Sequence, residues 1–293
     1  MIGTIGEGLY ELGVDADAVE APPRGGFGGD AANTAVMAAR LGGGRLCGRV
    51  GDDALGRLLL EFWRRNDVDT RWVVLDEAPT GIYVNERLAD GRCRFHYHRR
   101  GSAGSRLCHD DVGDGFLDDL DVLHFTGITL AISTSAATAA REAARRARER
   151  GALVSFAVNH RPALHGDEQE LAASARAADV VFVSREEAET VFGAARPADV
   201  ASALGSGPAE IVVTLGEEGA TAIVQGREIT VPAPATAAVD ASGAGDALAA
   251  VYLAGRIGGA SPERALTRAV EAASLSCRSY GAALSYPAMS ELA

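Results

Sequence analysis

The stretch Asp240-Ala-Ser-Gly-Ala-Gly-Asp246, which precedes an apolar run with helical spacing, is the most informative part of this chain. Gly243, Ala244 and Gly245 carry little or no side chain, so their backbone can come close to a ligand. At a helix N-terminus their N–H groups would be unpaired donors beside the positive end of the helix dipole, which favours a phosphate. A carboxylate would repel phosphate there, unless Asp246 takes the proton from a hydroxyl that attacks a phosphoryl group. Taken alone, the stretch is equally compatible with a glycine-rich turn before a helix.

Length and composition bound the fold and the partners. The chain has 293 residues, 47% of them hydrophobic, which is enough for the core of one large α/β domain over 1–293. No apolar run is long enough to span a membrane, and the N-terminal residues lack a basic leader or a signal segment. The net charge of −12 argues against nucleic acid as a partner. The four cysteines form no C-x-x-C pair, so we expect neither disulfides nor zinc, and a reduced cytoplasmic location.

The basic residues are all arginine, because the sequence contains no lysine. This excludes a P-loop nucleotide site and the strand lysine of protein kinases. It also excludes Schiff-base chemistry, which requires a lysine amine. Any phosphoryl transfer must therefore rely on backbone amides, arginine and a metal ion.

Strand-like and helix-like segments alternate along most of the chain, which predicts right-handed βαβ units and a parallel sheet. The expected strands are 1–6, 46–50, 122–125, 152–158, 180–183 and 211–215. The expected helices are 31–41, 55–65, 135–150, 186–192 and those that follow Gly243.

Residues 71–98 break this alternation with three β-like runs and no helix between them. The runs are 72–75, 81–88 and 92–98, and Ala89-Asp90-Gly91 between the last two predicts a hairpin turn. We expect a small β-sheet appendage of the same domain that is formed mainly by an insertion at about 71–100. Such an appendage can act as a lid, as a dimer surface, or as both, because exposed sheet edges seek partners. A homodimer through this lid is the expected assembly.

A second motif lies near the N-terminus. It reads Gly28-Gly29-Asp30-Ala-Ala-Asn33-Thr-Ala35 and is followed by Arg40-Leu41-Gly42 and Val50-Gly51-Asp52-Asp53-Ala-Leu-Gly56. Gly28 and Gly29 let the backbone approach a ligand, and Asn33 offers donors and an acceptor to a polyol. A loop before a helix capped by Asp30 would explain this motif if it stood alone. It does not stand alone, because the first motif follows about 210 residues later.

With both motifs in this order, nearly the whole chain resembles the ribokinase-like carbohydrate kinases, the phosphofructokinase-B superfamily. The resemblance implies an α/β three-layer sandwich with a mostly parallel central sheet and a small β-sheet lid. It also implies ATP-dependent phosphorylation of a small sugar, with Asp246 as the base. The amides of Gly243, Ala244 and Gly245 would then stabilise the transferred phosphoryl group.

Within the superfamily the chain is most similar to the 2-keto-3-deoxygluconate kinases. Three stretches carry this likeness: Tyr97-His-Arg99-Arg-Gly-Ser-Ala103, Gly127-Ile-Thr-Leu-Ala-Ile-Ser133 and Asn159-His-Arg161-Pro-Ala-Leu164. The resemblance implies that Tyr97, Arg99 and Arg161 bind an acidic sugar, whose carboxylate suits bidentate guanidinium groups. A surface ion pair is the alternative for each arginine. Arg100 competes with Arg99, because neighbours on a strand face opposite sides.

The resemblance also implies a nucleotide site. The residues it assigns to ATP are Ser184, Thr214, Gly216, Gly219, Gly243 and Gly245. Around Gly216, a simple β-turn would have the same sequence. Ser184-Arg-Glu-Glu187 stands where relatives carry Asn-x-x-Glu, and Glu187 is expected to help hold Mg²⁺ through water.

Three further positions depart from the family pattern. Ala157 stands where relatives carry an Asp near the sugar or phosphate, and Ala241 replaces a Thr near a site for a monovalent cation such as K⁺. The segment 43–50 is one residue shorter than usual.

We therefore expect an ATP-dependent kinase for a primary hydroxyl of a sugar or sugar acid, with 2-keto-3-deoxygluconate as the leading substrate. Ala157 keeps open a neutral acceptor of the fructose, ribose or adenosine type. A sugar-binding or regulatory protein without catalysis is the alternative from another class, since a fold does not fix a function.

Overall fold

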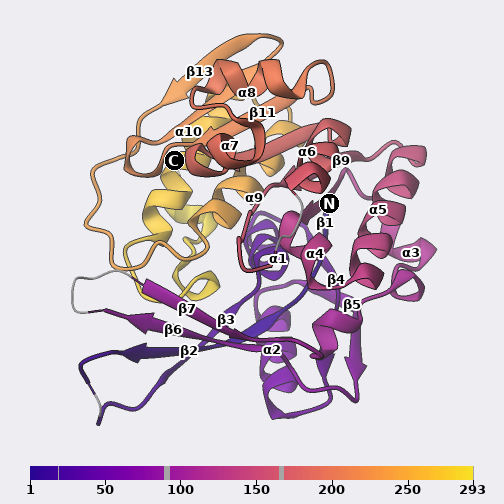
Figure 1. The fold of residues 1–293 in the computed structure, drawn as a ribbon, viewed down its shortest axis with the longest axis vertical. Coiled ribbons are helices and arrows are strands. Elements are labelled where there is room, and N and C mark those ends of the chain that lie inside the picture. Colours follow the sequence, from indigo (N-terminus) through magenta and orange to yellow (C-terminus); the bar gives the residue numbers. More distant parts are fainter. Residues whose placement is uncertain (19, 89–92, 165–167, 293) are drawn as a thin grey trace.

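A computed structural model describes residues 1–18, 20–88, 93–164 and 168–292 of the chain. Its centre is a twisted sheet of nine strands in the order β13-β12-β11-β10-β9-β8-β1-β4-β5 (Figure 1). All neighbouring strands from β10–β11 through to β4–β5 run parallel, and only β12 and β13 form antiparallel pairs. The strands are β1 (Ile2–Ile5), β4 (Gly44–Gly51), β5 (Asp69–Asp76), β8 (Val122–Thr126), β9 (Leu153–Ala157), β10 (Val180–Ser184), β11 (Glu210–Thr214), β12 (Ala220–Val224) and β13 (Arg227–Val231).

Helices cover both faces of this large sheet, because successive residues of each buried strand point to opposite sides. In β10, Val180 and Phe182 join one apolar cluster, and Val181 and Val183 join the other. The first cluster contains residues of α1 (Asp30–Arg40), α2 (Ala54–Arg65), α9 (Ala244–Ile257) and α10 (Pro262–Ser276). The second contains residues of α3 (Asp114–Leu117), α4 (Gly127–Ile132), α5 (Thr134–Glu149), α6 (Glu168–Ala177), α7 (Arg185–Phe192) and α8 (Pro197–Leu204). The three-layer α/β architecture expected from the sequence is confirmed.

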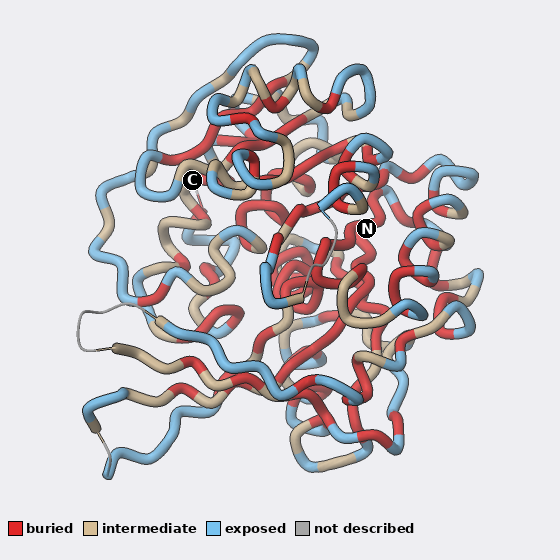
Figure 2. Tube along the Cα trace, in the orientation of Figure 1, coloured by how far each residue is buried: buried red, intermediate tan, exposed pale blue. Residues whose placement is uncertain are grey.

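Burial follows these layers (Figure 2). In α5, alanines recur on the buried face at helical spacing, and the Ser133 hydroxyl caps the helix by accepting the N–H of Ala136 at 3.1 Å. In α1 every residue from Asp30 to Ala39 is buried, because the helix lies between the large sheet and α9. No helix in the described ranges combines the length and apolar character needed to cross a membrane.

A second, small sheet lies beside the large one, with the order β3-β2-β6-β7 (Figure 1). Its strands are β2 (Leu9–Asp15), β3 (Arg24–Gly28), β6 (Ile82–Arg87) and β7 (Cys93–His98). In β2 the buried face carries Glu11 and Gly13 as well as Leu9, so its sequence lacks the alternation that marks a half-buried strand.

The expectation that an insertion at 71–100 supplies the appendage is therefore wrong in part. Two of the four strands come from residues 9–28, and the run at 72–75 belongs to β5, which pairs in parallel with β4 at the edge of the large sheet. A β-like run does not reveal its partner strand, because pairing is non-local. The hairpin turn expected at Ala89-Asp90-Gly91 lies outside the described residues.

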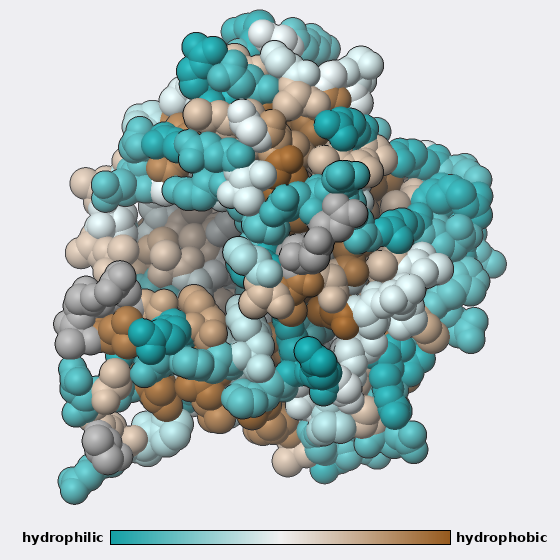
Figure 3. Space-filling model, in the orientation of Figure 1, coloured by the Kyte–Doolittle hydropathy of each residue, from teal (hydrophilic) through white to brown (hydrophobic). Residues whose placement is uncertain are grey.

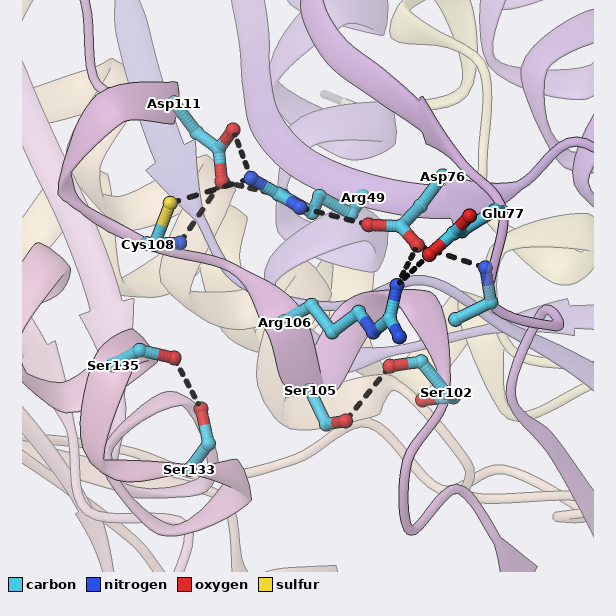
Figure 4. A network of polar contacts seen from close by, with 11 residues as sticks. Arg49, Asp76, Glu77, Ser102, Ser105, Arg106, Cys108, Asp111, Ser133 and Ser135 are labelled. Atoms are coloured by element: carbon cyan, nitrogen blue, oxygen red, sulfur yellow. Dashed lines mark hydrogen bonds and ion pairs between the residues drawn. The ribbon is translucent and has the colours of Figure 1, made fainter.

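The segment that follows β7 is tied to the large sheet by a chain of ion pairs (Figure 4). Arg49 of β4 binds Asp111 through two nitrogens, at 2.7 and 2.9 Å, and binds Asp76 of β5 at 2.7 Å. Arg106 reaches the other oxygen of Asp76 at 2.8 Å. Because Asp76 and Asp111 are both nearly buried, these contacts tie the part of this segment from Arg106 to Asp111 to the large sheet.

Two glycines at the ends of α1 provide a matched test of how tightly its N-terminus is packed. Gly29 and Gly42 share a φ of 102°, but a Cβ at Gly29 would lie 2.3 Å from the carbonyl oxygen of Glu7, whereas one at Gly42 meets nothing within 4 Å. We expect Gly42→Ala to lower the free energy of unfolding by about 1 kcal/mol, and Gly29→Ala by about 3 kcal/mol or more. Urea unfolding measures both, and equal losses would show that the crowding at Gly29 is relieved.

Candidate active site

A pocket lies between the small sheet and the carboxyl ends of the parallel strands, where α/β proteins usually bind ligands. Its volume is about 670 Å³, and Figure 3 shows the hollow above the small sheet. Its wall combines residues that follow β1, β7 and β9 with the N-termini of α1 and α9. Segments from all along the chain therefore meet at one place.

Asp246, in the first turn of α9, lies in this pocket and binds a residue of the other motif. The amide of Asn33 donates to its Oδ2 at 2.9 Å, across 213 positions of sequence. Burial raises the pKa of Asp246 to about 8, and the nearby charge of Asp30 acts in the same direction, whereas Asn33 and Arg161 act against the rise. A carboxylate with such a pKa is suited to proton transfer near neutral pH.

Asp30 forms a second carboxylate–amide pair beside the first. Its Oδ2 accepts from the side chain of Asn159 at 3.0 Å, and its Oδ1 accepts the N–H of Ala31 at 2.8 Å. Asn159 has a φ of 39°, in the left-handed region that asparagine tolerates better than most residues. The N-cap of α1 is Gly29 rather than Asp30. Asp30 lies in the first turn of the helix and lines the pocket.

The three residues predicted to cradle a phosphate lie at the start of α9, and one of their N–H groups is already bonded. Gly243 is the N-cap and adopts the left-handed conformation, with a φ of 77°. The N–H of Ala244 already donates to the carbonyl of Ala241 at 3.2 Å. The N–H of Gly245 has no intrahelical acceptor, because it belongs to the first turn, and a Cβ there would meet nothing within 4 Å. Gly245 is therefore the most open donor of the predicted set.

Neighbouring side chains hold this cradle in shape. The carboxylate of Asp240 accepts the N–H of Ser242 at 2.9 Å and that of Gly281 at 3.0 Å. The hydroxyl of Tyr286 donates to the carbonyl of Gly243 at 2.8 Å. Asp240 thus ties the loop to the C-terminal segment, which makes it a supporting residue that the sequence motif alone did not explain.

On the acceptor side, the structure distinguishes Arg99 from Arg100. Arg99 is buried and lines the pocket, with its guanidinium carbon 4.6 Å from the ring centre of Tyr97, whereas Arg100 is exposed and absent from the pocket wall. Arg161 also lines the pocket, with Nη1 3.8 Å from Glu187. Of the two predicted glycines, Gly29 lines the pocket and Gly28 packs behind it, where a Cβ would lie 2.5 Å from the hydroxyl of Tyr83.

Of the predicted nucleotide residues, Gly243 and Gly245 line this pocket. The other four, Ser184, Thr214, Gly216 and Gly219, lie outside its wall, at the carboxyl ends of β10 and β11 and in the turn that follows β11. Thr214 ends β11 and Ser184 ends β10. Gly216 has a φ of 61° and open space around its Cα, so a ligand can approach it. Gly219 is different, because a Cβ there would lie 2.1 Å from the carbonyl of Val231, so close packing alone requires a glycine.

Glu187 already accepts two backbone hydrogen bonds. Its Oε1 accepts the N–H of His160 at 2.9 Å, and its Oε2 accepts the N–H of Ser184, also at 2.9 Å, as part of a capping box. The carboxylate therefore ties α7 to the turn that carries Arg161. In the part of the chain that the structure describes, no three His, Cys, Asp or Glu side chains form a metal cluster. A magnesium ion here would depend on nucleotide phosphates and water, as Mg²⁺ commonly does.

Comparison with known proteins decides the family. A model described as pfkB family carbohydrate kinase matches residues 14–289. The chain belongs to this family. The protein is therefore a carbohydrate kinase of the pfkB family, a phosphotransferase that acts on an alcohol group, and the resemblance carried by the two sequence motifs is confirmed.

Individual relatives of this pfkB kinase differ in the substrates that their names specify. It is 38% identical to a 2-dehydro-3-deoxygluconokinase from Thermoproteus tenax, over 82% of this chain and 76% of that relative. It is 34% identical to fructokinase-1 from Oryza sativa subsp. japonica, over 77% of this chain and 72% of the relative. The crystal structure of a fructokinase with bound ATP from Xylella fastidiosa superposes with a TM-score of 0.90, at 26% identity, over 99% of this chain and 96% of that one.

Sequence reasoning missed several wall residues of this kinase. Glu7 and Tyr83 line the pocket, and so does Phe95, but none of them belongs to the two motifs. A usable signal existed for Glu7, because a carboxylate directly after a buried first strand lies at the carboxyl edge of a parallel sheet. Tyr83 and Phe95 gave no such signal, since alternating aromatic residues are typical of any half-buried strand.

Asp246 should make the fold less stable as pH rises. Its folded pKa of about 8 lies above its ordinary value of 3.8, so the stability it contributes is present below pH 3.8 and is lost as pH rises through 8. We expect Asp246→Asn to raise the melting temperature by about 5 °C at pH 8, with a gain that shrinks steadily toward pH 5. Thermal unfolding of the two proteins tests this, with Asp52→Asn on the exposed surface as the control. A gain independent of pH would contradict the raised pKa.

Proposed function

We propose that this kinase transfers the γ-phosphoryl group of ATP to a primary hydroxyl of 2-keto-3-deoxygluconate, the compound called 2-dehydro-3-deoxygluconate in the names of its relatives. The observation that carries the proposal is one pocket that combines Asp246, with its raised pKa, and two arginines, Arg99 and Arg161. A guanidinium group is the side chain best matched to the carboxylate of a sugar acid. The similarity to the Thermoproteus tenax relative supports the same substrate.

In this proposal Asp246 removes the proton of the attacking hydroxyl. Asn33 holds Oδ2 of Asp246 and so fixes the carboxylate at the pocket floor. The attacking oxygen then faces the start of α9, where the N–H of Gly245 and the helix dipole stabilise the charge of the transferred phosphoryl group. Asp240 and Tyr286 keep this backbone in place through their contacts with the loop.

The nucleotide side of the proposal uses the open space at Gly216 and Gly245. ATP would lie between the start of α9 and the turn after β11, near Ser184, Thr214, Gly216 and Gly219. Magnesium, when bound, neutralises phosphate charge. Glu187 would meet the ion only through water, because both of its oxygens accept backbone N–H groups. Dependence on a monovalent cation such as K⁺ is a separate prediction, because Ala241 replaces the Thr that relatives carry near that cation site.

We also propose that the small sheet is a lid over the acceptor. Tyr97 lies at the end of β7 and Arg99 directly after it, and both line the pocket. Closing this sheet would exclude water, which competes with the sugar as acceptor. A homodimer through the outer edges of the same sheet remains a prediction from the general behaviour of exposed edges.

A neutral acceptor of the fructose type is the second candidate. The relative from Oryza sativa supports it. Ala157 keeps it open, because this buried residue leaves no carboxylate where relatives carry an Asp near the sugar or phosphate. This candidate does not use the charge of Arg99.

Replacing the proposed base tests the mechanism. Asp246→Asn should lower kcat by about a thousandfold or more and leave ATP affinity within about threefold, because the amide cannot accept the proton. For the wild type, kcat at saturating acceptor should rise with pH, by up to tenfold per pH unit, and level off near pH 8 as Asp246 ionises. Coupled ATP-consumption assays measure both. Near-normal turnover of the variant would remove Asp246 as the base.

Two adjacent arginines test the acid-sugar pocket. Arg99→Met should raise KM for 2-keto-3-deoxygluconate about thirtyfold or more, because a charged hydrogen-bond pair is lost, whereas Arg100→Met should change it less than twofold. Both are assayed on an acceptor panel of 2-keto-3-deoxygluconate, its galactonate epimer, fructose, ribose and adenosine. Turnover on neutral acceptors alone would replace the first candidate by the second.

A further inference from the structure

The pocket wall contains an ion pair that no step of the proposed reaction uses. Glu7 follows β1 and Arg99 follows β7, and their side chains are 1% and 8% exposed. One contact joins them, from Nη1 of Arg99 to Oε1 of Glu7. Nε and Nη2 of Arg99 and Oε2 of Glu7 are buried and, across the described ranges, have no hydrogen-bond partner. Buried polar atoms are rarely left in this state, so the pair requires an explanation.

Arg99 is held rigidly on its other sides. Its guanidinium lies over the ring of Tyr97, and its carbonyl accepts the N–H of Ser102 at 3.0 Å. The turn that follows is anchored to the large sheet through Arg106 and Asp76. The pair is closely packed as well, because a Cβ at Gly104 would lie 2.8 Å from that of Glu7. Arg99 cannot swing away to find another partner without disturbing this packing.

The negative charges around the Glu7–Arg99 pair disfavour the binding of a further carboxylate beside it. Among the described residues, four carboxylates, those of Glu7, Asp30, Asp240 and Asp246, line the pocket together with two guanidinium groups. Burial raises the pKa of Glu7 to about 7, against the lowering effect of Arg99. Asp30, at the start of α1, is the other charged group that acts on Glu7, and it raises the pKa further. A carboxylate bound to Arg99 would add to this effect, because like charges disfavour ionisation.

We propose that Glu7 is the positioning residue for Arg99, and that it takes up a proton when the carboxylate of the acceptor binds. In the empty pocket ionised Glu7 is the counterion that holds the guanidinium in place. The acceptor carboxylate then pairs with Nε and Nη2, and a proton from solvent binds the carboxylate of Glu7, so the total charge of the pocket is unchanged. This inference rests on the proposed acid acceptor, and it predicts that acid binding, unlike neutral-sugar binding, consumes a proton.

Calorimetry of acceptor binding tests the inference directly. The titrations use Asp246→Asn as the parent protein, because it prevents turnover and removes the other carboxylate that titrates in this range. Binding of 2-keto-3-deoxygluconate at pH 7.5, measured in buffers of different ionisation enthalpy, should take up about 0.7 proton. Its Kd should rise with pH above 7, approaching tenfold per pH unit. Fructose, as the neutral probe, should take up no proton if it binds.

Adding Glu7→Gln should abolish the uptake and flatten the pH dependence of Kd, because the amide keeps a hydrogen bond to Arg99 but cannot titrate. Glu77→Gln is the matched control, since Glu77 also pairs with an arginine but is 88% exposed. Its uptake should equal that of the parent. Glu7→Asp, which keeps the charge, should retain the proton uptake while weakening acid binding, because its shorter side chain no longer reaches Arg99.

The outcomes are distinct. Acid binding without proton uptake in the parent overturns the inference even if Glu7→Gln fails to fold, and so does equal uptake with and without Glu7. In both cases the acid remains the substrate and the proposed function stands. Phosphorylation of neutral acceptors alone, with no acid bound, overturns the proposed function and this inference with it.

Discussion

The contact between α1 and α9 is the constraint on which the site depends. It brings the amide of Asn33 to 2.9 Å from the carboxylate of Asp246, although 213 positions separate the two residues. Helix α1, which is buried along nearly its whole length, can lie this close to α9 because many of its buried side chains are small alanines. Both helices begin at the carboxyl edge of the large sheet, so both N-termini face the same pocket.

A second feature of the pocket is the excess of negative charge in its wall. Without lysine in the chain, the positive charge in this wall comes from arginine, and its described residues include more carboxylates than guanidinium groups. Two of these carboxylates are each paired with an amide, Asp246 with Asn33 and Asp30 with Asn159. An amide donates a hydrogen bond to a carboxylate oxygen but does not neutralise its negative charge, so burial still disfavours the ionised form of Asp246. Asp246 accordingly has a pKa of about 8.

The supporting contacts show how backbone geometry is protected around this charge. Asp240 holds two N–H groups of separate segments, and Glu187 does the same for the turn that carries Arg161. Neither residue needs to touch a substrate to matter. The glycine-rich loop before α9 has little rigidity of its own, because glycine is conformationally free, and Asp240 fixes its backbone.

The sequence by itself determined the features that depend on neighbours along the chain. Small residues before an apolar helix predicted the cradle and the place of Asp246, and the alternation of segments predicted the large parallel sheet. The tertiary structure alone decided which strands pair, as with β5 beside β4 and β2 beside β6, and which polar groups meet, as with Glu7 and Arg99. The physical reason is that helix capping and side-chain periodicity act over a few residues, whereas strand pairing and buried ion pairs are chosen across the whole folded chain.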